Sequence, residues 1–157
     1  VDIKEYAAEF DSISLCLSKG LGAPVGSVLI GKKDFIKKSR RVRKVFGGGM
    51  RQAGIIAAGG LYALKNNVER LQEDHKHARA LETALLDLDW VKDVVPVDTN
   101  IVVALLHDES KRDTLINKMA EKQVKVMAFG PGMIRFVTHL DISELQIDET
   151  IEVIRSI

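Results

Sequence analysis

Apolar residues along this 157-residue chain occur either in short runs typical of strands or at the spacing of three and four typical of helices. Short apolar runs at 13–17 and 28–30 predict two strands, and a brief amphipathic stretch at 3–10 predicts a helix before them. Helical spacing then predicts a cation-rich helix from Lys33 that ends at the glycines of 47–49, followed by an Ala/Gly-rich helix over 51–65. We expect this second helix to be largely buried, because its glycines let neighbouring backbones approach closely.

The second half has a different order of elements. Apolar residues three and four apart between 68 and 88 predict one long amphipathic helix. Strands are expected at 94–97, 101–106, 124–127 and 133–137, with a helix over 109–122. Ser143 is expected to N-cap a last helix, with Gln146 completing the capping box. From about residue 68 the pattern is that of a small α+β unit.

The pattern therefore divides the chain into residues 1–67 and 68–157. Two strands do not form an independently stable sheet, and the chain starts without Met, as if inside a structured region. We expect it to be a piece of a larger protein.

Composition narrows the class of protein. With 46% apolar and 29% charged residues the chain is expected to fold, and its net charge of +1 creates no overall field for nucleic acid or membrane. It has no apolar run near the roughly 18 residues of a membrane span. The single Cys16 excludes a disulfide framework and fits a reducing, cytoplasmic compartment. Because it lies in a predicted strand, we expect Cys16 to be buried.

A dense run of cations occupies 32–44. It could form a solvated helix face, which we favour, or bind nucleic acid, although only Phe35 and Phe46 interrupt it and stacking side chains are therefore few. Lys44 and Arg51 flank the triple glycine, so a third interpretation is that both reach one phosphate or carboxylate.

Lys19 lies between the first two predicted strands, among the small residues of 18–27. One interpretation is an ordinary lysine in a glycine-rich loop. The other is an amine delivered to a cavity at the end of a sheet, where burial lowers its pKa and lets it form a Schiff base with a carbonyl cofactor.

Arg135 stands alone among apolar residues in the predicted strand 133–137. It could be an edge-strand arginine that extends to water, or it could bind a carboxylate through its two parallel N–H donors. His139 follows as a turn residue or as a wall of a site. His75 and His77 are two apart on a helix and so do not share a face, which argues against a metal pair.

Three segments together resemble the low-specificity L-threonine aldolases, pyridoxal-phosphate enzymes of the aspartate-aminotransferase (type I) fold. They are Cys16–Ser27 with Lys19, Gly47–Gln52, and Arg135–His139, and Asn67–Leu71 with Glu73–His75 adds to the likeness. The resemblance implies that the chain is the C-terminal part of such an enzyme. Residues 1–67 would then end the large cofactor-binding domain, and 68–157 would form the small α+β domain.

The resemblance also implies an activity and a site. The enzyme would be a carbon–carbon lyase that cleaves L-threonine, L-allo-threonine and related β-hydroxy amino acids to glycine and an aldehyde. Lys19 would be the Schiff-base lysine and Arg135 would bind the substrate carboxylate. Lys44 and Arg51 would lie near the cofactor phosphate or the active-site entrance, in a homodimer or homotetramer.

Two alternatives accompany this assignment. The chain could be a non-catalytic fragment or one partner of a split enzyme, because the upstream half would supply the catalytic base and the ring-stacking imidazole. It could also be another type I pyridoxal-phosphate lyase, since Lys19 and Arg135 do not by themselves select the bond that breaks.

Overall fold

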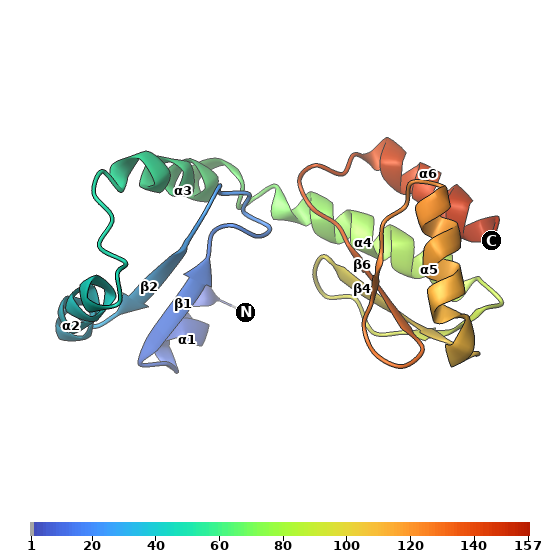
Figure 1. Cartoon of the computed structure of the whole chain (residues 1–157), viewed down its shortest axis with the longest axis horizontal. Helices are drawn as coiled ribbons and strands as arrows, with labels where there is room; N and C mark the ends of the chain where they lie inside the picture. The colour runs from blue at the N-terminus through green and yellow to red at the C-terminus, as the bar shows by residue number, and fades with distance from the viewer. Residues whose placement is uncertain (1) are drawn as a thin grey trace. The chain divides into compact units, whose positions relative to one another are not determined.

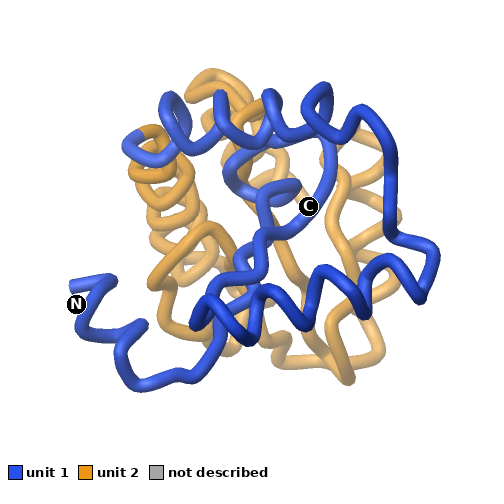
Figure 2. The backbone as a smooth tube through the Cα atoms, turned by 90° about the vertical axis from the view of Figure 1, so that its left-hand side faces the viewer, with its two compact units in different colours: residues 1–69 blue, residues 70–157 orange. Residues whose placement is uncertain are grey.

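A computed structural model describes residues 2–157 (Figure 1) and divides the chain into two compact units. Residues 1–69 form the first unit and residues 70–157 the second, and Figure 2 colours them separately. The ranges expected from the sequence were 1–67 and 68–157.

Unit 1 contains α1 (Ile3–Ala8), β1 (Ser12–Cys16), β2 (Ser27–Gly31), α2 (Lys33–Val45) and α3 (Gly54–Asn66). β1 and β2 pair antiparallel as a two-stranded sheet, and no residue of either strand is buried. Cys16 is consequently exposed, so the expectation that it is buried is wrong. A strand is covered only where another layer packs on it.

α3 begins later than expected and is mostly exposed. Its buried residues are Gly60 and Ala63, whereas Ile55, Leu61 and Tyr62 are each more than half exposed. The expectation of a largely buried helix is therefore wrong for the described residues. The close approach attributed to its glycines does occur at Gly59 and Gly60, which contact the loop between β1 and β2.

Unit 2 is a four-stranded antiparallel sheet with three helices. Its elements are α4 (Leu71–Leu86), β3 (Val91–Val94), β4 (Ile101–Leu106), η1 (Glu109–Lys111), α5 (Arg112–Glu121), β5 (Met127–Ala128), β6 (Met133–Val137) and α6 (Glu144–Arg155). The strand order is β3-β4-β6-β5, which makes β6 an interior strand. No helix among residues 2–157 is long and apolar enough to span a bilayer.

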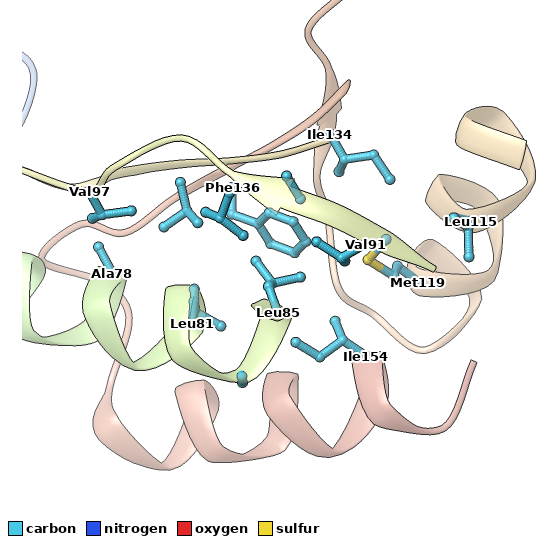
Figure 3. Close-up of a cluster of buried hydrophobic side chains, with 14 of the residues drawn as sticks. Ala78, Leu81, Leu85, Val91, Val97, Leu115, Met119, Ile134, Phe136 and Ile154 are labelled. Carbon is cyan, nitrogen blue, oxygen red and sulfur yellow. The ribbon is translucent and has the colours of Figure 1, made fainter. Parts of the chain in front are cut away.

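The core of unit 2 lies on one face of this sheet. Figure 3 shows Leu81 and Leu85 of α4, Ile154 of α6, and Ile134 and Phe136 of β6 pointing toward one another. Leu115 and Met119 bring α5 to the same cluster. The three helices therefore contribute to a single apolar layer against the sheet.

Side-chain alternation assigns the remaining strand residues to the opposite face. Successive side chains of a strand point to opposite faces, so Arg135 lies on the other face from Ile134 and Phe136. Its directly paired neighbours are Val103 on β4 and Met127 on β5. This second face, which we call the open face, is apolar around the guanidinium, and Asp93 of β3 lies on it beside Leu105.

Two strands differ from their expected ranges. β3 ends at Val94, before Pro96, because proline has no N–H to donate to a ladder. β5 is limited to Met127–Ala128, although the pattern predicted a strand over 124–127. The capping box of α6 is confirmed, with the Ser143 hydroxyl accepting from the Gln146 N–H and the Gln146 side chain accepting from the Ser143 N–H.

Candidate active site

The loop that carries Lys19 is closed by its own backbone. The N–H of Gly22 donates to the Lys19 carbonyl at 2.8 Å, which forms a tight turn. The N–H of Ala23 donates to Leu17 and that of Leu17 to Gly26, each at 3.0 Å. Gly22 has φ of 68° and Gly26 of 106°, a conformation that favours glycine. The glycines of this segment are therefore required by its backbone geometry.

α3 supports this loop from one side. A Cβ on Gly59 would lie 2.8 Å from Pro24 Cδ, and one on Gly60 would lie 2.9 Å from Leu17 Cδ1. Leu21 is buried in the same place, and the Asn67 side chain donates to its carbonyl at 2.8 Å. Packing and hydrogen bonds therefore hold the backbone around Lys19 in one conformation.

The Lys19 side chain itself is exposed, and it forms no ion pair within residues 2–157. The enclosed cavity expected around it is not formed by the described residues. The structure thus presents an accessible amine on a well-supported loop. No described residue of unit 1 buries this amine.

Lys44 and Arg51 lie on either side of the glycine segment, and both are exposed. The Lys44 side chain folds over Gly49, where a Cβ would come within 2.9 Å of its Nζ. Gly47 has φ of 83° and Gln52 has φ of 52°, so the chain turns sharply at both ends of the segment. No hydrogen bond joins Lys44 to Arg51 in the described part of the chain.

Arg135 is half-buried at the centre of the open face. Its Nη2 lies 3.4 Å from Met127 Sδ, and its guanidinium carbon lies 5.5 Å from the centre of the Phe129 ring. The edge-strand interpretation is wrong, because β5 and β6 pair at this residue and β4 flanks β6 on its other side.

The guanidinium has no acidic partner among residues 2–157. Its Nε is buried and makes no hydrogen bond, and sulfur is a weak acceptor for Nη2. A half-buried guanidinium in apolar surroundings lacks the acceptors that it needs. A small carboxylate would satisfy two of its N–H groups at once.

A buried ion pair lies at the start of α4. Arg70 Nη2 contacts Asp74 Oδ2 at 2.6 Å, and the Asp74 side chain is fully buried. The Thr138 hydroxyl donates to the Asp74 carbonyl at 2.7 Å, which connects this turn to the end of β6. The only sequence signal for this pair is the four-residue spacing of Arg70 and Asp74 on a helix, which was assigned no role.

The histidines are spread over unit 2. His139 is exposed and its Nδ1 accepts a long 3.4 Å hydrogen bond from the Asp141 N–H, as a turn residue would. It also borders a cavity of about 440 Å³ between residues 122–126 and α6. His77 is buried and His75 is half-buried. No group of three metal-ligating side chains occurs in the described range.

Phe129 and Met127 lie beside the candidate site and were not expected there from the sequence. Phe129 precedes the Gly130-Pro131-Gly132 turn, and neither residue belongs to a recognisable motif. Only the pairing of β5 with β6 brings them to Arg135. Lys19, Lys44 and Arg51 belong to unit 1, whereas Arg135 and its neighbours belong to unit 2.

Comparison with known proteins identifies related chains. Residues 1–109 match the beta-eliminating lyase family. The chain is 46% identical to the low specificity L-threonine aldolase of Escherichia coli K12. The alignment spans 148 residues and covers 94% of this chain and 43% of that protein. It is 40% identical over 129 residues to the Saccharomyces cerevisiae enzyme of the same name, covering 81% of this chain and 33% of that one.

Solved structures share the fold. A Listeria monocytogenes EGD-E protein assigned as an L-allo-threonine aldolase superposes with a TM-score of 0.76 at 17% identity, covering 98% of this chain and 46% of that one. Sphingomonas wittichii serine palmitoyltransferase superposes with a TM-score of 0.74 at 20% identity, and the superposition covers 95% of this chain and 40% of that one. The expected fold class is confirmed, and the chain spans less than half the length of the curated relatives named above.

Proposed function

The chain belongs to the beta-eliminating lyase family, and from that premise we propose that it is the C-terminal part of a pyridoxal-phosphate-dependent aldolase. The complete enzyme cleaves L-threonine, L-allo-threonine and related β-hydroxy amino acids to glycine and an aldehyde. The observation that carries this proposal is the 46% identity to an E. coli L-threonine aldolase across 94% of the chain.

The cofactor would be held by residues of unit 1. Lys19 supplies an accessible amine on a loop whose backbone is held by α3, which fits a covalent anchor for an aldehyde. Lys44 and Arg51 supply exposed cations suited to the cofactor phosphate or to the entrance of the active site. When bound, pyridoxal phosphate supplies an electron sink for the negative charge that develops as the Cα–Cβ bond breaks.

Arg135 would bind and orient the substrate. Two of its N–H groups donate to the carboxylate, and this places the bonds at Cα in a defined direction. The apolar side chains beside it, Val103, Met127 and Phe129, offer no competing acceptor as strong as a carboxylate. The base that accepts the β-hydroxyl proton is assigned to no residue of this chain.

The remaining parts of the proposal concern the assembly. Residues 1–69 would complete a large domain with the upstream half of the enzyme, and residues 70–157 would be the small domain. We propose a cytoplasmic homodimer or homotetramer with no nucleic-acid or membrane partner. The exposed apolar side chains of α3 and β2 support a contact of this kind.

The experiment reconstitutes the complete enzyme with pyridoxal phosphate and assays glycine formation from L-threonine. Borohydride reduction and mass spectrometry then locate the attached cofactor, and we expect it on the peptide with Lys19. Lys19→Ala should abolish both attachment and activity. Lys65→Ala, which removes another exposed lysine of unit 1, should leave both intact. Attachment retained in Lys19→Ala would refute the role of Lys19.

A second candidate is a β-eliminating lyase, which the description of the matched family favours. Such an enzyme releases a group from Cβ and leaves the Cα–Cβ bond intact. Assaying L-cysteine and L-threonine side by side distinguishes the two reactions, since elimination from cysteine yields sulfide and pyruvate. If the enzyme releases sulfide from L-cysteine and forms no glycine from L-threonine, the β-eliminating lyase replaces the aldolase as the proposed function.

A further inference from the structure

Two large apolar side chains lie exposed beside Arg135 on the open face. Phe129 is 51% exposed and Met127 is 59% exposed. Both contact the guanidinium, Phe129 through its ring and Met127 through its sulfur. An aromatic face attracts a guanidinium within about 6 Å of its centre.

The backbone holds Phe129 in this place. Its N–H donates to the Met133 carbonyl at 3.1 Å, so the ladder between β5 and β6 continues as far as the turn. Arg112 of α5 donates to the Gly130 carbonyl at 2.6 Å. Gly132 has φ of 61°, and a Cβ there would lie 3.1 Å from Glu109 Cβ. The turn is therefore anchored from both sides, and Phe129 is its last residue before the glycine.

An arginine side chain has several rotatable bonds and loses conformational entropy when it binds a ligand in one geometry. Stacking on a ring restricts the guanidinium before the ligand arrives, and this lowers the entropic cost of binding. A cation–π contact also uses no N–H group of the guanidinium as a hydrogen-bond donor. These N–H groups are the ones that a carboxylate accepts from.

We propose that Phe129, with Met127 beside it, is a positioning residue that holds the Arg135 guanidinium ready for the carboxylate of the substrate. This inference rests on the proposed function of Arg135 and adds the residues that orient it. Phe129 acts through Arg135 and contacts no reacting atom.

The test measures kcat and KM for L-threonine in the complete enzyme, together with the affinities for glycine and for ethanolamine. Ethanolamine is an amine of similar size that lacks the carboxylate. Phe129→Leu removes the ring and keeps an apolar side chain. We expect it to raise KM and the glycine Kd by about 2- to 5-fold, with kcat and ethanolamine binding unchanged.

Matched variants separate positioning from folding. Phe129→Tyr keeps the ring and should restore the wild-type glycine Kd. Leu145→Ala removes an exposed apolar side chain from α6, which packs on the other face of the sheet, and should change neither constant. The fluorescence of Trp90, the single tryptophan, checks that each variant remains folded.

A wild-type glycine affinity in Phe129→Leu would overturn the inference. So would a loss of glycine affinity in Phe129→Tyr as large as in Phe129→Leu, or a loss of ethanolamine affinity in Phe129→Leu as large as that of glycine. Failure of the proposed function has a different signature, since the wild-type enzyme would then cleave no β-hydroxy amino acid. The comparison of glycine with ethanolamine still decides the inference in that case, because it measures carboxylate binding and requires no cleavage.

Discussion

At the scale of single residues, Arg135 combines a position and a chemistry that a lysine cannot reproduce. Its planar guanidinium donates two parallel N–H groups, whereas a lysine ammonium is a point charge. In the complete enzyme we expect Arg135→Lys to raise KM for L-threonine about 10- to 100-fold, from the loss of a charged hydrogen bond. Steady-state kinetics measure this, and an unchanged kcat/KM would remove Arg135 from the site.

The buried carboxylate of Asp74 leads to a prediction about stability. Asp74→Asn removes the buried counter-charge of Arg70, whose side chain is 21% exposed, and leaves only the longer 3.7 Å contact with the exposed Glu73. We expect the free energy of unfolding of unit 2 to fall by about 2–3 kcal/mol. Urea denaturation followed by Trp90 fluorescence measures this loss.

The control for Asp74→Asn is an ion pair at the surface. Lys76 and Glu144 lie 2.8 Å apart with both side chains about 70% exposed, and the hydrogen bond from Lys76 lowers the pKa of Glu144. Glu144→Gln should leave the urea midpoint nearly unchanged, because water screens the pair. Equal losses in the two variants would show that burial of Asp74 contributes nothing.

At the scale of elements, the contact between α3 and the Lys19 loop depends on Gly59. In Gly59→Ala the new methyl group would overlap the Pro24 ring, which cannot move without the loop. We expect faster hydrogen exchange at the amides of Leu17, Gly22 and Ala23, which close the loop. Gly54→Ala is the control, since a Cβ there meets no atom within 4 Å. Unchanged protection in Gly59→Ala would show that α3 does not hold the loop.

The N-terminus of α6 gives a second prediction at this scale. Ser143→Ala removes the hydroxyl that accepts from the Gln146 N–H. The expected loss of unfolding free energy is about 1 kcal/mol, the usual value for an N-cap. Ser39→Ala serves as the control, because the Ser39 hydroxyl bonds to the Phe35 carbonyl within α2 and caps no helix end. A loss no larger than in this control would contradict the capping role.

At the scale of the whole molecule, the two units differ in how much apolar surface they bury. The buried apolar residues described in unit 1 are Leu17, Leu21, Ala23 and Ala63, whereas unit 2 has the core drawn in Figure 3. A unit with little core opens at low free energy. We therefore expect trypsin to digest unit 1 first and to leave a fragment that begins near Asn66.

Mass spectrometry of the digest over time tests this difference. In the complete enzyme the same sites of unit 1 should resist cleavage, because the upstream half would cover them. Cleavage of both units of the isolated chain at equal rates would contradict the proposed difference in stability.

The sequence by itself determined the local features of this protein. The periods of apolar residues placed most of the elements, with β3 and β5 as the exceptions. The triple glycine ended a helix and the Ser143 capping box began one, as expected. Alternation along β6 separated Arg135 from Ile134 and Phe136. These features follow from residues close together in the chain, where backbone geometry and side-chain spacing decide the outcome.

Only the tertiary structure decided the features that depend on distant residues. It placed β6 inside the sheet, left Cys16 exposed on an uncovered sheet, and brought Phe129 to the Arg135 guanidinium. Which face of a strand is buried depends on the layer that packs against it, and which side chains meet depends on strand pairing. These contacts arise between elements, so the spacing of residues within one element cannot specify them.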